Sequence, residues 1–74
     1  MIRVIIDYSP LWATMEQKGI SQYRLLKDGI IDNKTLDGLK KKNNITVLTL
    51  GRLCLYLDCT PDKVIRFLQA PDPP

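Results

Sequence analysis

The sequence predicts a compact all-α domain of five short helices, preceded by a short N-terminal strand or extended arm. Three observations support this fold class. The chain has 74 residues, 45% of them hydrophobic, which is enough for one small core and one domain. Residues that begin and end helices recur along it. Between them, apolar residues repeat at spacings of three and four, as on one face of a helix.

The N-terminal residues Ile2 to Ile6 form a run of mainly β-branched side chains, which predicts a short strand. A single strand is not stable alone. We therefore expect it to pair with the C-terminal segment around Phe67, to pair with its copy in a second subunit, or to pack as an extended arm. The sequence does not decide among these.

The first two helices have clear boundaries. Ser9 followed by Pro10 predicts a capped helix start, because proline needs no hydrogen-bond partner at the first helical position. Gly19 suits the left-handed residue that ends this helix. Its inward-facing residues are predicted to be Leu11, Trp12 and Met15. Ser21 then caps a second helix over residues 22 to about 27.

The third helix is predicted to be amphipathic. Gly29 ends the second helix, and at least one of the two isoleucines that follow it is expected to be buried. Asp32 caps the third helix, in which Leu36 and Leu39 face inward at a spacing of three. The lysines at 40–42 place positive charge at the negative end of the helix dipole.

The fourth helix, capped by Thr46, is predicted to be the central one. Its apolar stripe is expected to consist of Val47, Leu50, Leu53, Cys54 and Leu57. Thr60 and Pro61 predict the start of a fifth helix. The buried face of that helix is expected to hold Val64, Phe67 and Leu68. The proline-rich residues 69–74 are expected to form a disordered tail.

Composition narrows the classes of function. Eleven Lys and Arg against eight Asp and Glu give a net charge of +3, a mild bias toward anionic partners such as nucleic acid. The chain has no His, the residue that most often serves as general base and metal ligand, so we expect no enzyme, no metal site and no cofactor. Cys54 and Cys59 lack zinc-site spacing and are interpreted as small apolar residues.

The sequence carries no segment expected to cross a membrane and no secretory signal peptide. With few cysteines, this indicates a cytoplasmic protein. Leu48 and Leu55 lie off the main stripe of the fourth helix, and Ile2, Val4 and Ile6 give the arm one apolar face. Such leftover apolar surface favours a partner, and the alternative is an arm that covers its own core.

The run from Ile20 to Leu39, ISQYRLLKDGIIDNKTLDGL, resembles the helix-turn-helix of the lambda-repressor-like family, the Cro and phage-repressor type also called XRE. The downstream segment 48–64 is similar to its fourth and fifth helices. The resemblance implies an arm at 1–8, a DNA-binding domain at 9–68 and a helix-turn-helix at about 21–41. In that family the second helix lies across the DNA backbone and the third enters the major groove.

The resemblance also implies which residues contact DNA. Asn33 and Lys34 take the base-reading positions, and these side chains suit adenine and guanine. Thr35 and Asp37 share that surface, where threonine can touch a thymine methyl or a phosphate and aspartate can accept from cytosine. The residues expected at the DNA backbone are Gln22, Lys40, Lys41, Lys42, Asn43 and Asn44.

Charge agrees with this placement, because residues 18–44 hold seven basic and three acidic side chains while the rest of the chain has four basic and five acidic ones. We therefore expect a small transcriptional regulator of bacterial or phage origin, associated with the nucleoid, that binds double-stranded DNA as a homodimer and acts as a repressor. The alternative is a protein-interaction module of the antirepressor or antitoxin type, which binds another regulator. Gly38, Asp37 and the modest net charge motivate that alternative.

Overall fold

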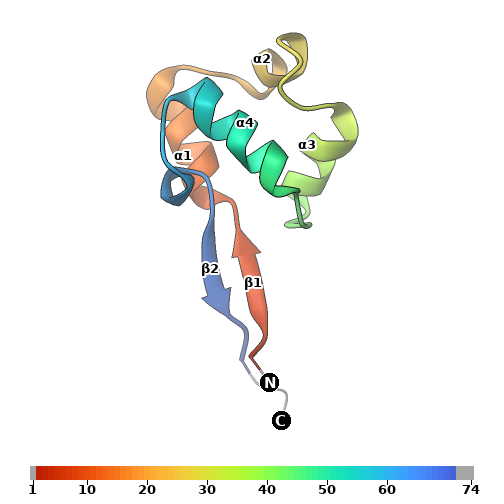
Figure 1. Cartoon of the computed structure of the whole chain (residues 1–74), viewed down its shortest axis with the longest axis vertical. Coiled ribbons are helices and arrows are strands. Elements are labelled where there is room, and N and C mark those ends of the chain that lie inside the picture. The colour runs from red at the N-terminus through yellow and green to blue at the C-terminus, as the bar shows by residue number, and fades with distance from the viewer. Residues whose placement is uncertain (1, 72–74) are drawn as a thin grey trace.

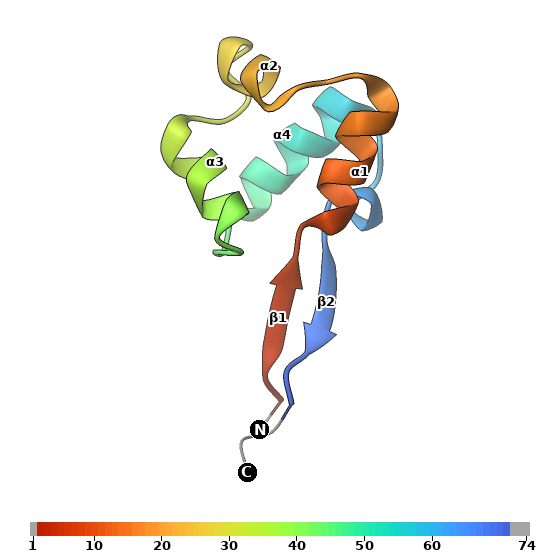
Figure 2. The same cartoon turned by 180° about the vertical axis from the view of Figure 1, so that it is seen from behind.

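The computed structural model describes residues 2–71 and contains four helices and a two-stranded sheet (Figure 1). The helices are α1 (Ser9–Lys18), α2 (Gln22–Lys27), α3 (Asn33–Lys40) and α4 (Val47–Leu57). The strands are β1 (Val4–Asp7) and β2 (Arg66–Gln69), and a single 3-10 turn spans Pro61–Lys63. The helices form one globular body, and the sheet projects from it, as both views show (Figures 1 and 2).

The prediction of a fifth helix is wrong. Thr60 and Pro61 begin only the 3-10 turn, after which the chain extends into β2 and pairs with β1 in antiparallel fashion, with Ile6 opposite Phe67. Pairing with β2 supplies backbone hydrogen-bond partners to the β-branched N-terminal strand, and a fifth helix in this segment could not supply them. Of the three arrangements considered for the N-terminal strand, pairing with the segment around Phe67 is therefore the correct one.

This correction changes the predicted burial and the predicted class. Val64 is fully buried as expected, but Phe67 and Leu68 are 65% and 43% exposed. Gln69, which the sequence analysis assigns to the tail, is the last residue of β2. Residues 72–74 of that tail lie outside the described residues. The domain is mostly helical with a small sheet, rather than all-α with five helices.

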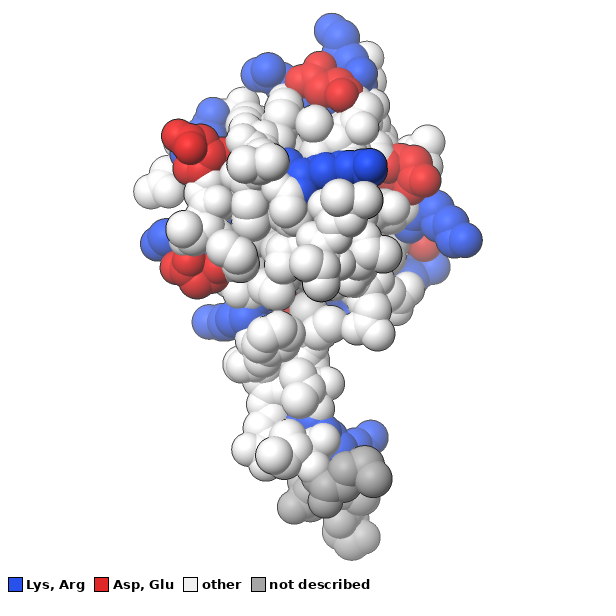
Figure 3. Space-filling view, in the orientation of Figure 1, with Lys and Arg blue, Asp and Glu red and all other residues white. Residues whose placement is uncertain are grey.

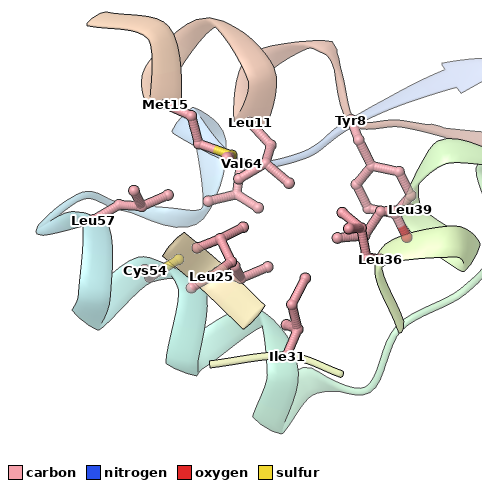
Figure 4. Close-up of a cluster of buried hydrophobic side chains, with 11 residues drawn as sticks. Tyr8, Leu11, Met15, Leu25, Ile31, Leu36, Leu39, Cys54, Leu57 and Val64 are labelled. Carbon is pink, nitrogen blue, oxygen red and sulfur yellow. The ribbon is translucent and has the colours of Figure 1, made fainter. Parts of the chain in front are cut away.

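The core lies between the helices and includes the side chains drawn in Figure 4. Leu36 and Leu39 are buried on the inner side of α3, as predicted. Ile31 is buried and Ile30 partly so, which confirms the expectation for that pair. Other core residues are Leu11, Met15, Leu25, Leu53, Cys54 and Leu57. Val47 is 84% exposed, contrary to prediction, because it occupies the first position of α4 and the buried stripe begins further along the helix.

Three of the predicted helix caps are confirmed. The side chains of Ser21, Asp32 and Thr46 each accept a hydrogen bond from the amide three residues later. Ser9 is not a cap, because it lies inside α1. Instead the Asp7 carboxylate accepts hydrogen bonds from the Ser9 amide at 3.1 Å and from the Ser9 hydroxyl at 2.7 Å. Asp7 therefore accepts hydrogen bonds at the start of α1, where the Ser9 hydroxyl was expected to act as the cap.

All four helices end in the same way. Each is followed by a left-handed residue, and the residue after that donates its amide to a carbonyl five positions earlier, which is the Schellman motif. Gly19 and Gly29 end α1 and α2, as predicted, but α3 and α4 end at Lys42 (φ 60°) and Asp58 (φ 53°). At the end of α4 this bond joins the Cys59 amide to the Cys54 carbonyl.

Candidate nucleic-acid interface

Helix α3 is held against the core from its inner side. Leu36 and Leu39 are buried, and Figure 4 shows the Tyr8 ring beside them. Tyr8 is 1% exposed and precedes α1 directly, so the junction between the sheet and the helices supports α3. Burial raises the pKa of the Tyr8 hydroxyl, which stays protonated and able to donate.

The N-terminal turn of α3 is fixed by its cap. The Asp32 carboxylate accepts a hydrogen bond from the Thr35 amide at 2.7 Å. The hydrogen bonds from Thr35 lower the pKa of Asp32, so the cap is ionised at neutral pH. The next two residues, Asn33 and Lys34, are exposed, and Thr35 is half-buried. The two predicted base-reading residues therefore lie next to each other on a rigid and accessible helix start.

Further along α3, the outward face carries an ion pair. The Lys41 ammonium lies 2.9 Å from the Asp37 carboxylate, and both side chains are mostly exposed. Such a surface pair contributes at most about 1 kcal/mol to stability.

The loop after α3 is ordered by two hydrogen bonds to Asn43. Its amide donates to the Gly38 carbonyl at 2.8 Å, and its carbonyl accepts from the Tyr8 hydroxyl. Lys42, which directly precedes Asn43, adopts a left-handed backbone conformation. This conformation costs a residue with a side chain roughly 1–2 kcal/mol. Every residue that the sequence analysis assigns to the DNA backbone in this stretch, 40–44, is exposed. The end of α3 and the loop after it therefore hold three neighbouring lysines in a defined arrangement.

Helix α2 exposes its predicted contact to the DNA backbone less fully than residues 40–44 do. Gln22 is half-buried and lines a shallow hollow together with Trp12 and Met15 of α1. At the other end of α2, the Tyr56 hydroxyl of α4 donates to the Asp28 carboxylate at 2.6 Å, and this bond raises the pKa of Tyr56. Helix α2 is thus tied to α4 at its C-terminal end.

Arg52 is a basic residue near the interface that the sequence analysis did not assign. It is exposed on α4 and lines a surface hollow with Asn33, Thr35 and Thr49, beside the start of α3. The available signal was its position off the buried stripe of α4, which indicates exposure. What brings it to α3 is the packing of the two helices, and no local pattern encodes that packing.

Basic and acidic side chains are unevenly spread over the surface. Figure 3 shows many of them toward the edges of the globular body, while a broad area over α4 and the upper sheet has few. Within residues 18–44, which include α2 and α3, basic side chains exceed acidic ones by seven to three. Among the described residues, no group of three or more His, Cys, Asp or Glu could hold a metal ion.

The sequence pattern of the Cro/C1-type HTH DNA-binding domain matches residues 10–69. The chain belongs to this family. The match covers α1 to α4 and the C-terminal strand, so the resemblance to the Cro and phage-repressor type is confirmed. Members of this family are DNA-binding domains of transcription regulators. The helix-turn-helix expected at about 21–41 corresponds to α2 and α3.

A solved structure shares the fold of this Cro/C1-type domain. The crystal structure of the transcriptional regulator VanUg superposes with a TM-score of 0.84 at 22% sequence identity, covering 90% of this chain and 89% of that one. Comparison with curated proteins gives no match. No helix among residues 2–71 of the domain is long and apolar enough to span a bilayer.

Proposed function

We propose that this protein binds specific sequences of double-stranded DNA as a homodimer, with the N-terminal half of α3 in the major groove, and that it acts as a repressor by blocking access to the DNA. The observation that carries the proposal is the start of α3, where Asn33 and Lys34 are exposed side by side beyond a fixed Asp32 cap. A helix that presents its first residues in this way matches how the major groove is read.

Base reading rests on α3. The amide of Asn33 can pair with adenine and the ammonium of Lys34 can donate to guanine, each worth about 1–3 kcal/mol of discrimination. Thr35 and Asp37 complete the reading surface with a hydroxyl and a carboxylate. Gly38 adds no side chain there, so specificity depends mainly on the first turn of the helix.

Backbone contacts flank the reading surface. Lys40, Lys41 and Lys42 with Asn43 and Asn44 would meet phosphates on one side, and Gln22 at the start of α2 would meet them on the other. Arg52, which is exposed beside the start of α3, would be a further phosphate contact. Such contacts set the orientation of the protein on DNA and make its binding depend on salt.

The test is a selection of bound sequences from a random duplex library at near-physiological salt. We expect an enriched palindrome whose half-sites are about one DNA turn, roughly 34 Å, apart. Absence of enrichment, with binding that salt abolishes, would contradict the proposal. That result would favour the protein-interaction alternative, which capture of a protein partner with α3 buried against it would then test.

Two variants separate the roles of the residues. Asn33→Ala should cost about 1–3 kcal/mol on the selected site and little on random DNA. Lys40→Ala should weaken binding to both DNAs and reduce the salt slope by about 1. Equal losses on both DNAs for Asn33→Ala would rule out its base-reading role. Titrations of labelled duplexes at several salt concentrations measure both quantities.

A further inference from the structure

The two-stranded sheet carries an apolar face that the helices cover only in part, at Ile6. Because Ile6 lies opposite Phe67 and side chains alternate along a strand, Val4, Ile6 and Phe67 share one face of the sheet. Val4 and Phe67 are exposed, and Figures 1 and 2 show the sheet projecting away from the helices. A two-stranded ladder exposed in this way is marginal in water. The sheet therefore gains from a surface that covers it.

This apolar face continues onto the globular body. Ile6 and Phe67 line a hollow of about 180 Å³ together with Val47 and Leu50 of α4. We call the set Val4, Ile6, Phe67, Val47 and Leu50 the sheet–α4 face. An apolar cavity of roughly 150 Å³ can take up a benzene ring, so this hollow has room for one large apolar side chain. The 84% exposed Val47 and the exposed Phe67 stand on its walls.

We propose that the sheet–α4 face is the surface through which two copies of this chain pair about a two-fold axis. The proposal rests on the proposed function only in that a dimeric DNA reader needs such a surface. In a two-fold contact the same patch meets itself, so it must offer both a projection and a recess. The sheet–α4 face has both, because apolar side chains stand exposed beside an apolar hollow.

Charge favours a second copy as the occupant. None of the five residues of the face is charged, and the charged residues of the paired strands, Asp7 and Arg66, bind each other at 2.6 Å. Two identical faces of this kind approach without repulsion, whereas two copies of the lysine-bearing loop would repel each other. A strongly acidic or basic partner would find no complementary charge on the sheet–α4 face.

The same arrangement links pairing to DNA reading. Tyr8 follows β1 directly and donates its hydroxyl to the Asn43 carbonyl in the loop after α3. The base of the sheet and the lysine-bearing loop are thereby held in one rigid unit. Pairing through the sheet–α4 face would fix both loops relative to the two-fold axis, and with them the separation of the two α3 helices on DNA.

The test is sedimentation equilibrium of the full chain without DNA, at several protein concentrations. We expect the wild-type chain to sediment as a dimer. Val47→Glu should raise the dimer dissociation constant at least about tenfold, because it places two like charges in the contact. The fold should survive, since an acidic residue at the first position of a helix suits the dipole. Phe67→Ser should weaken the dimer from the side of the sheet.

Leu55→Glu is the matched control. Leu55 is 86% exposed, is also apolar, and lies eight residues further along α4, which is about 12 Å along the helix axis. Its replacement should leave the dimer intact, and thermal unfolding of each variant confirms that it folds. A monomeric wild-type chain overturns the proposal, as does equal weakening by Val47→Glu and Leu55→Glu.

The outcome is separable from that of the proposed function. A dimer weakened by Val47→Glu, together with no enriched DNA sequence, would support the interface and contradict the proposed function. An enriched sequence bound by a chain that stays monomeric without DNA would support the reading of DNA sequence and contradict the interface. The two measurements therefore fail independently.

Discussion

Helices α3 and α4 are built with the same local devices but differ in what they present to the outside. Each begins at a side chain that caps its first turn, Asp32 or Thr46, and each ends at a left-handed residue other than glycine. The outward side of α3 is polar and charged, whereas that of α4 carries the exposed Val47, Leu48 and Leu55. Local signals thus set where a helix begins and ends, and the outward residues set which partner it suits.

The largest expected effects come from the inner sides, where the two helices should behave alike. Leu39→Ala in α3 and Leu53→Ala in α4 each remove a fully buried side chain and should lower the free energy of unfolding by about 2–5 kcal/mol. Urea unfolding monitored by circular dichroism measures this. A near-zero cost for Leu39→Ala alone would mean that α3 is not docked on the core.

Replacement of the two left-handed residues, Lys42 and Asp58, should distinguish an effect on fold stability from an effect on DNA binding. Lys42→Gly relieves backbone strain and should stabilise the fold by up to about 1 kcal/mol. If Lys42 contacts phosphate as proposed, the same change should lower the salt slope of DNA binding by about 1. Asp58→Gly should stabilise the fold by less, because aspartate tolerates this conformation better, and should not weaken DNA binding. Thermal melts and duplex titrations on both variants provide the comparison. Unchanged DNA binding by Lys42→Gly would argue against the loop as a phosphate site.

Each helix also contains an interior glycine, with a smaller expected effect. A Cβ added at Gly51 of α4 meets nothing within 4 Å, and one added at Gly38 of α3 meets the Asn43 Cβ at 3.6 Å, an ordinary contact. Gly51→Ala and Gly38→Ala should each stabilise the fold by about 0.5–1 kcal/mol through helix propensity. A loss of stability in Gly38→Ala would show that the loop after α3 packs more tightly on the helix than this contact indicates.

Acidification distinguishes the two caps, because Asp32 titrates and Thr46 does not. The pKa of Asp32 is lowered in the folded state, so its contribution is present above its unfolded pKa and is lost as the pH falls through the folded value. Asp7, whose hydrogen bonds from Ser9 lower its pKa to about 2, acts in the same direction. Asp32→Asn should therefore reduce, without abolishing, the loss of stability in acid. Thermal melts from neutral to acidic pH would show an unchanged slope if the Asp32 cap contributes nothing.

Most of the helix-turn-helix could be predicted from the sequence because its signals are local. Ser21, Asp32, Gly29 and the pair Leu36 and Leu39 act within one or two helical turns, and the structure has each as predicted. The contact residues on α3 were placed by resemblance, and their exposure is now known while their roles stay predictions. Lys42 as a left-handed residue was missed, because lysine gives no local sign of that conformation.

The errors lie where a distant partner decides the structure. Thr60 and Pro61 carry a helix-start signal, yet the chain beyond them becomes β2 because β1, about sixty residues earlier, offers it a ladder. The Tyr8 bond to Asn43, the Tyr56 bond to Asp28 and the position of Arg52 beside α3 arise in the same way from packing between elements.

The sequence by itself therefore determined the four helices, three of their caps and the charge of the α2–α3 region, since capping, helix-stop signals and apolar periodicity act between neighbours along the chain. The tertiary structure alone decided that the two ends of the chain form a sheet, that Tyr8 supports the loop after α3, and that an apolar face stays open beside α4. These depend on contacts between distant residues, whose free energy appears only once the core has brought them together.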